Sequence, residues 1–530
     1  MGLSVRAGGV CGIDLGTTNS AVAIIVDGKA TIVPDAQGRR TVPSVVTFLP
    51  NEGEVLVGHA ARRRLTKDAR NTFYSVKRFM GKRFEDKTVA EDARRVPYEV
   101  VRSEADDFRC NPGNLPPELC LDGCGPRGDG SGLAALYCPA LNRRVMPEEA
   151  SMHVLRHLLD LAEAALDDGP ITRAVVTVPA YFDDDQRAAT ERAARAAGVE
   201  TVKVLHEPVA AALAYGVDVE GDETVFVFDL GGGTFDVSVL DVGGGAVEVL
   251  ATGGDAHLGG DDLDRAVAVW LSKEARALGA VVDPRGALVA SRRAREALSD
   301  KMHVDIPMPG GVSKRLTRPL LEKVCADVLR RMRLPVENAA DAAGINLEAL
   351  QAAAAKKKGK GVVSRRGGRP FDHILLVGGA TRTPAVRRFC ENTFGRRPRP
   401  GLVNPDEVVA LGAAVHAGAL EGLLAEQEML GPMQAGLIRA FAARMRREQG
   451  EEAFDAALGM DTASGGGEVW TEGAMAAAAA AAGLDVVEDE DEDDDWGPDD
   501  LRELTHDSSL NEEETEETED GAEVEVRRDE

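Results

Sequence analysis

Two short stretches of the sequence place an aspartate, glycines and threonines at a turn between apolar runs. They read DLGTT at residues 14–18 and DLGGGTFD at residues 229–236. Main-chain N–H groups in such turns bind anions, and threonine hydroxyls add hydrogen bonds to phosphate. The aspartates would repel phosphate unless a hard cation, typically Mg²⁺ with its waters, lay between them. One copy would fit an ordinary hairpin, but two copies in matched context predict phosphate chemistry.

Three further segments place polar residues where a strand meets a turn or a helix. Residues 174–198 read AVVTVPAYFDDDQRAATERAARAAG, which predicts a buried strand, a proline and an acidic first helical turn. Residues 202–216 read VKVLHEPVAAALAYG, with Glu207 where the strand meets the helix. Residues 373–389 read HILLVGGATRTPAVRRF. The glycine pair there permits close approach of the backbone, and the guanidinium of Arg382 has the planar shape that stacks on an aromatic base.

Strands and helices in alternation must position these residues. The apolar runs at 225–228 and 235–240 predict a strand on each side of the second turn, and residues 10–25 repeat this plan around the first. Two hairpins with the same turn chemistry predict two similar lobes that face each other. The alternation predicts an α/β fold with a doubly wound sheet, in which ligands gather at the strand ends.

Length and charge set the wider limits. A chain of 530 residues exceeds a single core, so we expect two or more domains. The net charge is −27, and residues 485–530 hold 24 Asp and Glu against three Arg, so the acidity belongs to a tail. No apolar run reaches transmembrane length. A strand is predicted from about residue 9, which leaves no room for a targeting peptide; of the cytoplasm and a plastid as compartments, this favours the cytoplasm.

The seven cysteines are odd in number and scattered, which argues against a secreted disulfide framework. Four lie close together, namely Cys110, Cys120, Cys124 and Cys138. Their only short spacing is C-x3-C and no histidine lies between them, so reduced thiols in a loop-rich insertion are favoured over a zinc site.

Together these segments resemble the nucleotide-binding domain of the Hsp70 (DnaK) chaperones, over roughly residues 9–425. RRVPYEVV at 94–101 and CPAL at 138–141 look most like the cyanobacterial and plastid members. The chain has neither a G-x-x-x-x-G-K-[ST] loop nor a G-x-G-x-x-G turn. The resemblance implies a two-lobed, actin-like ATPase fold, with duplicated sheet-and-helix lobes around a nucleotide cleft. It also implies ATP and ADP as ligands, with Mg²⁺ as the metal.

The resemblance also implies a role for individual residues. Lys77 would lie beside the γ-phosphate and help to place the attacking water, with Glu207 as its partner across the cleft. Pro179 and Arg187 match residues that report nucleotide state. Asp14, Asp229 and Asp236 would order Mg²⁺ and its waters. The phosphate contacts would come from Gly16, Thr17, Thr18, Gly231, Gly232, Gly233 and Thr234, and the adenosine contacts from Arg295, Ser299, Gly378, Gly379, Arg382 and Asp406.

Several positions depart from the family pattern. Glu296 stands where a second arginine usually stacks on adenine, which predicts weaker adenine affinity, and His206 and Val209 flank Glu207-Pro208 with unusual types. Residues 104–136 and 352–370 are interpreted as insertions. The second is basic, and a solvated loop is favoured there over a nucleic-acid patch.

The C-terminal part departs most. The sequence predicts a helical extension at residues 426–458 and a low-complexity, acidic, disordered tail at residues 459–530. No peptide-binding β-sandwich is recognisable there. We therefore expect this chain not to grip client peptides itself and to act through J-domain proteins and nucleotide-exchange factors, with neither a membrane nor a nucleic acid as partner. Two alternatives remain open, a non-catalytic nucleotide-sensing regulator of Hsp70 co-factors and a sugar-kinase-like phosphotransferase.

Overall fold

The computed structural model describes residues 9–50, 54–104, 132–166, 169–216, 223–243, 246–308, 311–348, 351, 371–398, 403–421 and 423. These residues all belong to one compact unit, residues 1–460. The predicted basic insertion at 352–370, the helical extension and the acidic tail lie outside the described residues. So do residues 105–131 of the predicted insertion at 104–136.

The first large sheet is built around the first predicted hairpin. Strands β1 (Gly9–Asp14) and β2 (Asn19–Val26) pair antiparallel, with the turn at 15–18 between them. The next strand in space beside β1 is β11 (Ile171–Val178), which runs parallel to it. The full order is β12-β11-β1-β2-β3, with β4 (Val42–Pro43) beside β2, β12 covering Thr201–His206 and β3 Lys29–Ile32.

The second large sheet repeats this plan. Strands β13 (Glu223–Leu230) and β14 (Phe235–Gly243) form the second predicted hairpin. Strand β18 (His373–Val377) runs parallel to β13, as β11 does to β1. The order is β15-β14-β13-β18, with β15 covering Ala246–Asp255. The predicted duplication of a hairpin-centred α/β lobe is therefore present in the fold, which is the actin-like fold expected above.

Each large sheet is mixed, because it contains both parallel and antiparallel pairs of strands. The strands joined by short turns run antiparallel, and only those reached through helices run parallel. Two strands linked by a tight turn must reverse direction, whereas a parallel pair needs a longer crossover. The antiparallel pairs at 15–18 and 231–234 are the two hairpins that the sequence predicted, and the parallel pairs follow from the predicted alternation of strands and helices.

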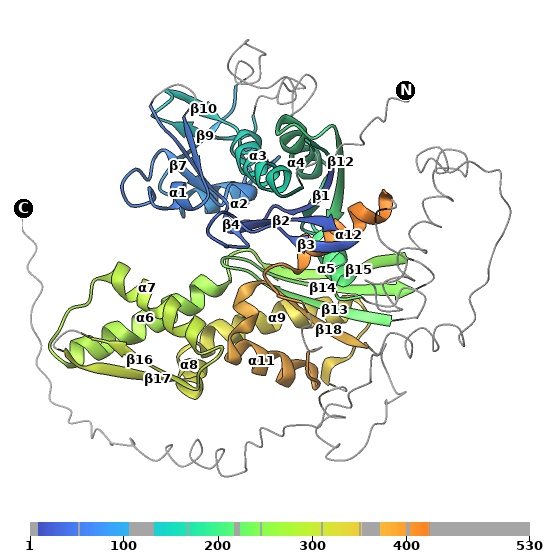
Figure 1. The fold of residues 1–530 in the computed structure, drawn as a ribbon. Helices are drawn as coiled ribbons and strands as arrows, with labels where there is room; N and C mark the ends of the chain where they lie inside the picture. The colour runs from blue at the N-terminus through green and yellow to red at the C-terminus, as the bar shows by residue number, and fades with distance from the viewer. Residues whose placement is uncertain are drawn as a thin grey trace, which may run out of the picture. The chain divides into compact units, whose positions relative to one another are not determined.

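Two helices lie between the large sheets and exchange sides. Helix α5 (Glu207–Ala214) follows the last strand of the first sheet, yet it shares a core with β13 and β18 of the second. Helix α12 (Val408–Leu420) follows the second sheet in the chain, yet it packs on β1, β2, β3 and β11 of the first (Figure 1). The approach is close: a Cβ at Gly12 would lie 2.0 Å from the nitrogen of Ala414, and one at Gly412 would lie 1.7 Å from the carbonyl oxygen of Ala210. Glycine at both positions is therefore required by packing.

Smaller elements cover these sheets. Helix α4 begins at the predicted acidic turn, where Asp183 accepts from the N–H of Gln186 in a capping box. Three small sheets are also present among the described residues. The first contains β6 (Val55–Val57), β5 (Val45–Phe48) and β7 (Thr72–Tyr74), and the second contains β10 (Arg143–Val145), β9 (Ala134–Cys138) and β8 (Glu99–Arg102). The third is the pair β16 (His303–Pro307) and β17 (Ser313–Thr317). The remaining helices are α1 (His59–Arg62), α2 (Lys87–Ala93), α3 (Pro147–Leu166), α4 (Asp184–Ala196), α6 (Gly260–Ala277), α7 (Pro284–Ala297), α8 (Arg318–Val324), α9 (Ala326–Ala342) and α11 (Pro384–Phe394), with 3₁₀ turns η1 (Val76–Arg78) and η5 (Gly379–Arg382). In the part of the chain that the structure describes, every helix is too short or too polar to cross a membrane.

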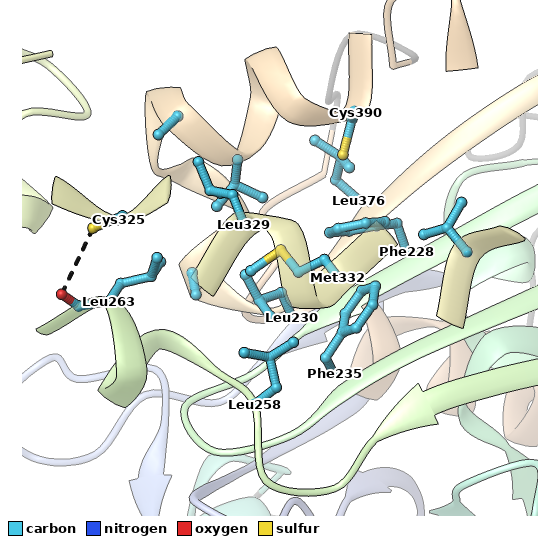
Figure 2. Packing of buried hydrophobic residues seen from close by; sticks show 14 of the residues in the cluster. Phe228, Leu230, Phe235, Leu258, Leu263, Cys325, Leu329, Met332, Leu376 and Cys390 are labelled. Carbon is cyan, nitrogen blue, oxygen red and sulfur yellow. Dashed lines mark hydrogen bonds between the residues drawn. The ribbon is translucent and has the colours of Figure 1, made fainter. Parts of the chain in front are cut away.

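The core of the second half lies between its sheet and helices α6, α8, α9 and α11. Phe228, Leu230 and Phe235 point from the second hairpin into this core and are fully buried. Figure 2 shows them against Met332 and Leu376. The thiol of Cys325 donates a hydrogen bond to the carbonyl of Leu263 there, drawn as the dashed line. The apolar side chains next to the turn thus anchor the strand ends that carry its aspartates.

Candidate functional site

Both glycine turns line one pocket. Its volume is about 790 Å³, part of it open to solvent. Residues from both halves of the chain form its wall, so the two hairpins that the sequence predicted to face each other do so here. The predicted site residues that line it are Asp14, Gly16, Thr17, Thr18, Lys77, Pro179, Glu207, Asp229, Gly231, Gly232, Thr234, Asp236, Gly378, Gly379 and Asp406.

The two turns are in contact with each other. A Cβ at Gly232 would lie 3.0 Å from the side chain of Thr18, so any larger residue would push the turns apart. The first turn is held by the hydroxyl of Ser44, which donates to the carbonyl of Gly16 at 2.7 Å. Glycine in the second turn therefore has a packing reason in addition to leaving its backbone open to a ligand.

Lys77 and Glu207 form an ion pair across the pocket. The Lys77 Nζ lies 2.6 Å from Glu207 Oε1, with the two side chains 6% and 14% exposed. Lys77 sits in the 3₁₀ turn η1, which begins at Ser75 with a φ of 55°, and its ammonium also lies 5.6 Å from the ring centre of Phe182. A non-glycine residue in this left-handed region is strained, and such strain concentrates at functional sites. The predicted partnership of Lys77 and Glu207 is thus present as a short, nearly buried contact.

Three half-buried carboxylates surround this pair. Asp14 ends β1, and Asp229 and Asp236 are cross-strand partners in β13 and β14. Burial, followed by repulsion from Glu207, raises the pKa of Asp14 and of Asp236 to about 7. The same two causes, together with repulsion from Asp236 and Asp14, raise the pKa of Asp229 well above its ordinary value. Lys77 opposes the shift at all three, but one ammonium cannot neutralise four carboxylates.

The excess of carboxylates fits a hard divalent cation, because carboxylate oxygen is the ligand that such ions prefer. Among the described residues, no three His, Cys, Asp or Glu side chains are close enough together to hold a metal directly. The contact of Asp14, Asp229 and Asp236 with Mg²⁺ mainly through water stays a prediction. Of the four clustered cysteines, Cys138 is a buried thiol, and the other three, Cys110, Cys120 and Cys124, lie outside the described residues.

The third predicted glycine turn closes the pocket on another side. Gly378 has a φ of 81°, and a Cβ there would lie 2.3 Å from the carbonyl oxygen of Leu230. A Cβ at Gly379 would lie 2.3 Å from a carboxylate oxygen of Asp406. Positive φ and close neighbours both demand glycine at Gly378. The turn therefore brings strand β18, the start of η5 and Asp406 to the pocket edge.

Three residues of the predicted adenosine set are not part of the pocket lining. Arg295 is buried and bonds Asp264 at 2.6 Å. The guanidinium of Arg382, predicted to stack on a base, instead lies 2.9 Å from Asp406. Ser299 is half-buried beyond the end of α7. Arg295 and Arg382 thus each form an ion pair with an aspartate, and the sequence spacing does not predict these pairs.

Two more predicted residues lie beside the pocket rather than in its wall. Arg187, in the first turns of α4, donates to the carbonyl of Phe182 at 2.6 Å and pairs with Asp184. The carbonyl of Gly233 accepts from the guanidinium of Arg78 at 3.0 Å. Of the two residues predicted to report nucleotide state, Pro179 therefore lines the pocket and Arg187 does not.

Sequence reasoning missed several residues at the site. Tyr181 lines the pocket, and burial, with repulsion from Asp236, raises the pKa of its phenol. It stands two residues after Pro179, which was the available signal. Arg40 bonds the buried Glu407 at 2.7 Å and joins parts of the chain 367 residues apart. No local sequence pattern predicts an ion pair between residues so far apart in the chain.

Comparison with known proteins agrees with this geometry. The family profile described as Hsp70 protein matches residues 10–113, 129–354 and 368–431. The chain is 41% identical to the chloroplastic Heat shock 70 kDa protein 6 of Arabidopsis thaliana over 445 residues, which are 81% of this chain and 55% of that protein. It is 40% identical to the chloroplastic Stromal 70 kDa heat shock-related protein of Pisum sativum over 445 residues, which are 81% of this chain and 56% of that protein.

A third relative comes from a red alga. The chain is 39% identical over 434 residues to the Chaperone protein dnaK of Cyanidioschyzon merolae, covering 78% of this chain and 62% of that protein. It thus spans a little over half the length of the curated relatives it matches. The family profile covers well over half of the chain, and the relatives include plastid proteins, as RRVPYEVV and CPAL predicted. The chain therefore belongs to the Hsp70 family.

Proposed function

We propose that residues 9–425 form an ATP-binding domain that hydrolyses ATP slowly in a chaperone cycle. The observation that carries the proposal is the single pocket in which two Asp-Gly-Thr turns meet the Lys77–Glu207 pair. A phosphate chain needs main-chain donors, a neutralising charge and a group that can place the attacking water, and the turns, the carboxylates with their cation and Lys77 would supply them.

The two ends of the pocket would bind different parts of the nucleotide. The threonines and glycines of the turns at 14–18 and 231–234 would hold the phosphates. Gly378 and Gly379 would let the adenosine approach the backbone beside Asp406. Arg295, Ser299 and Arg382 remain proposed adenosine contacts, and each would have to act from outside the present pocket wall.

The carboxylates would serve the metal rather than the nucleotide. Bound Mg²⁺ would neutralise phosphate charge, as in other phosphoryl-transfer sites. Asp14, Asp229 and Asp236 would hold it through water. Their raised pKa values support this role, because a group of buried like charges is stabilised by a divalent cation.

The ion pair would act on the water that attacks. Glu207 accepts a hydrogen bond from Lys77 and so fixes the direction of its ammonium. A fixed ammonium can orient a water and stabilise charge that grows in the transition state, without tightening ground-state binding. Thr234 would complete the phosphate contacts from the end of the second turn.

The wider cellular role follows the family. We propose that J-domain proteins and nucleotide-exchange factors regulate the ATPase, and that Pro179 and Arg187 transmit nucleotide state. Two relatives are named as chloroplast proteins, so we propose the plastid as compartment. The cytoplasmic location expected from the sequence stays a prediction.

Substitution of Lys77 tests the proposal. Lys77→Ala should leave the affinity for Mg·ATP within a few-fold of the unsubstituted chain, while single-turnover hydrolysis falls roughly 100-fold or more, because the ammonium acts mainly on the transition state. Single-turnover hydrolysis of labelled ATP measures this. Lys82→Ala is the matched control, since Lys82 is a lysine close in sequence that is not part of the pocket lining and whose ammonium donates to the hydroxyl of the exposed Thr88.

Each outcome separates the competing functions. Unchanged hydrolysis in Lys77→Ala would overturn the assignment of that residue. Tight nucleotide binding by the unsubstituted chain without turnover would favour the nucleotide-sensing regulator. Transfer of the phosphate to a sugar in place of water would favour the phosphotransferase.

A further inference from the structure

The second glycine turn is held from outside the pocket by three successive hydrogen bonds. Its three glycine carbonyls all act as acceptors, and none of their donors belongs to the pocket lining. The two main-chain donors come from the start of helix α6, and the third donor is a side chain. The bonds run from Gly260 N to Gly231 O at 3.0 Å, from Asp261 N to Gly232 O at 2.8 Å, and from Arg78 Nη2 to Gly233 O at 3.0 Å.

These bonds determine where the amides of the turn point. In a planar trans peptide, the C=O of one residue and the N–H of the next point in opposite directions. Carbonyls of Gly231, Gly232 and Gly233 that are held outward therefore turn the N–H groups of Gly232, Gly233 and Thr234 inward. Within the described ranges, no acceptor hydrogen-bonds to these three N–H groups. Successive unpartnered N–H groups on one side of a turn form an anion-binding site.

Arg78 differs from the other two donors because it crosses between the halves of the chain. It stands 155 positions before Gly233 and directly follows Lys77 in η1. The bonds from Gly260 and Asp261 are main-chain contacts within the second half, which no side-chain substitution removes. Arg78 is thus the donor through which the first half acts on the backbone of the second turn.

A buried carboxylate fixes the direction of Arg78. Its Nη1 lies 3.4 Å from Oδ1 of Asp92, which is 4% exposed. The same oxygen lies 2.7 Å from Nε2 of His257, a residue of the second half. With Nη1 directed to Asp92 and Nη2 to Gly233, the planar guanidinium has one orientation. The Arg78–Asp92–His257 cluster therefore tethers the back of the turn.

We propose that Arg78 is a positioning residue for phosphate binding: it holds the Gly233 carbonyl outward and so keeps the Thr234 N–H aimed into the pocket. It does this without being part of the pocket wall itself. The proposal rests on the proposed function, since it assumes that the pocket binds nucleotide phosphates. If Arg78 has this role, its substitution should lower the affinity only for ligands that carry a phosphate chain.

Isothermal titration with ADP and with adenosine tests this. Arg78→Met, which keeps the length of the side chain but has no donor, should weaken ADP binding about tenfold, as expected for the loss of a charged hydrogen bond. Adenosine affinity should not change. Arg78→Lys keeps the charge but can bond only one of the two partners well. Its affinity for ADP should therefore lie between that of the unsubstituted chain and that of Arg78→Met. Arg95→Met is the matched control, because Arg95 lines the neighbouring 610 Å³ cavity with Arg78 and does not bond the turn.

The outcomes are separable. Equal losses for ADP and adenosine, or unchanged ADP affinity in both Arg78 variants, would overturn the positioning role. If Arg78→Met fails to fold, as judged by thermal unfolding, the same comparison in Arg78→Lys decides. Failure of the unsubstituted chain to bind ADP would instead overturn the proposed function, which is a distinct result.

Discussion

The two hairpins share a backbone plan but differ in what supports and surrounds their turns. The first turn is held through Ser44 alone, whose hydroxyl donates to the carbonyl of Gly16 and whose N–H donates to the carbonyl of Thr18, and its strand carries a single carboxylate, Asp14, opposite Ala21. The second turn has all three glycine carbonyls held, and its strands place Asp229 directly opposite Asp236. The heavier support thus lies where the repulsion is greatest.

The strands below the turns differ as well. Gly12 and Val227 each stand two residues before the aspartate of their turn. Val227 packs in the core beneath helix α5, whereas Gly12 faces the backbone of α12 at contact distance. Duplication therefore preserved the strand order, while packing and charge diverged to give one half a tight helix contact and the other an acidic turn.

The largest loss of stability should come from filling the space at Gly12. Gly12→Ala places a methyl group 2.0 Å from the Ala414 nitrogen, and because backbone must move, we expect a loss of about 3 kcal/mol or more of stability. Val227→Ala, the equivalent site in the second half, should lose about 2 kcal/mol as a buried large-to-small change. Urea unfolding of both variants measures this. A smaller loss for Gly12→Ala than for Val227→Ala would contradict the contrast between the two strands.

The next effect concerns the acidic turn. Asp236 ionises near pH 7 in the folded chain, against 3.8 for its ordinary value, so the folded state retains a proton that the unfolded state loses. The stability of the nucleotide-free protein should fall as pH rises from about 4 to about 7. Asp236→Asn lacks this penalty and should be more stable by up to about 4 kcal/mol above pH 7.

Thermal unfolding of both proteins with a chelator between pH 4 and pH 8 checks this. The half-buried His153 and His416, whose pKa values are lowered to about 4 by desolvation, impose the opposite pH trend on both proteins, so that trend cancels in the difference. Asp300→Asn, at an exposed carboxylate, should show no such growing advantage. A constant difference across this pH range would mean that Asp236 is not the source.

The smallest effect should come from the first turn. Ser44→Ala removes the donor to Gly16 and the buried partner of the Ser20 hydroxyl at 2.9 Å, and should cost about 1 kcal/mol of stability. ADP affinity should fall only a few-fold, less than in Arg78→Met. Titration of both variants with ADP provides the ranking. A greater loss in Ser44→Ala would show that the first turn carries more of the phosphate binding.

The sequence was informative where chemistry is local. Glycines beside aspartate between apolar runs predicted both hairpins, and the acidic run at 183–185 predicted the start of α4, because turns and caps depend on a few neighbouring residues. It was not informative about partners far along the chain. Arg382 and Arg78 find their acceptors through the folded arrangement, and no spacing rule predicts which carboxylate or carbonyl an arginine will meet.

The exchanged helices have a consequence for synthesis. One apolar face of the first sheet is covered by α12, which begins about 400 residues after β1. That face lacks this helix until nearly all of the described chain has been made. At roughly 5–20 residues per second, this wait lasts on the order of half a minute. During that time the nascent chain exposes the kind of surface that aggregates. A member of a chaperone family is thus expected to need protection itself until residue 420 has left the ribosome.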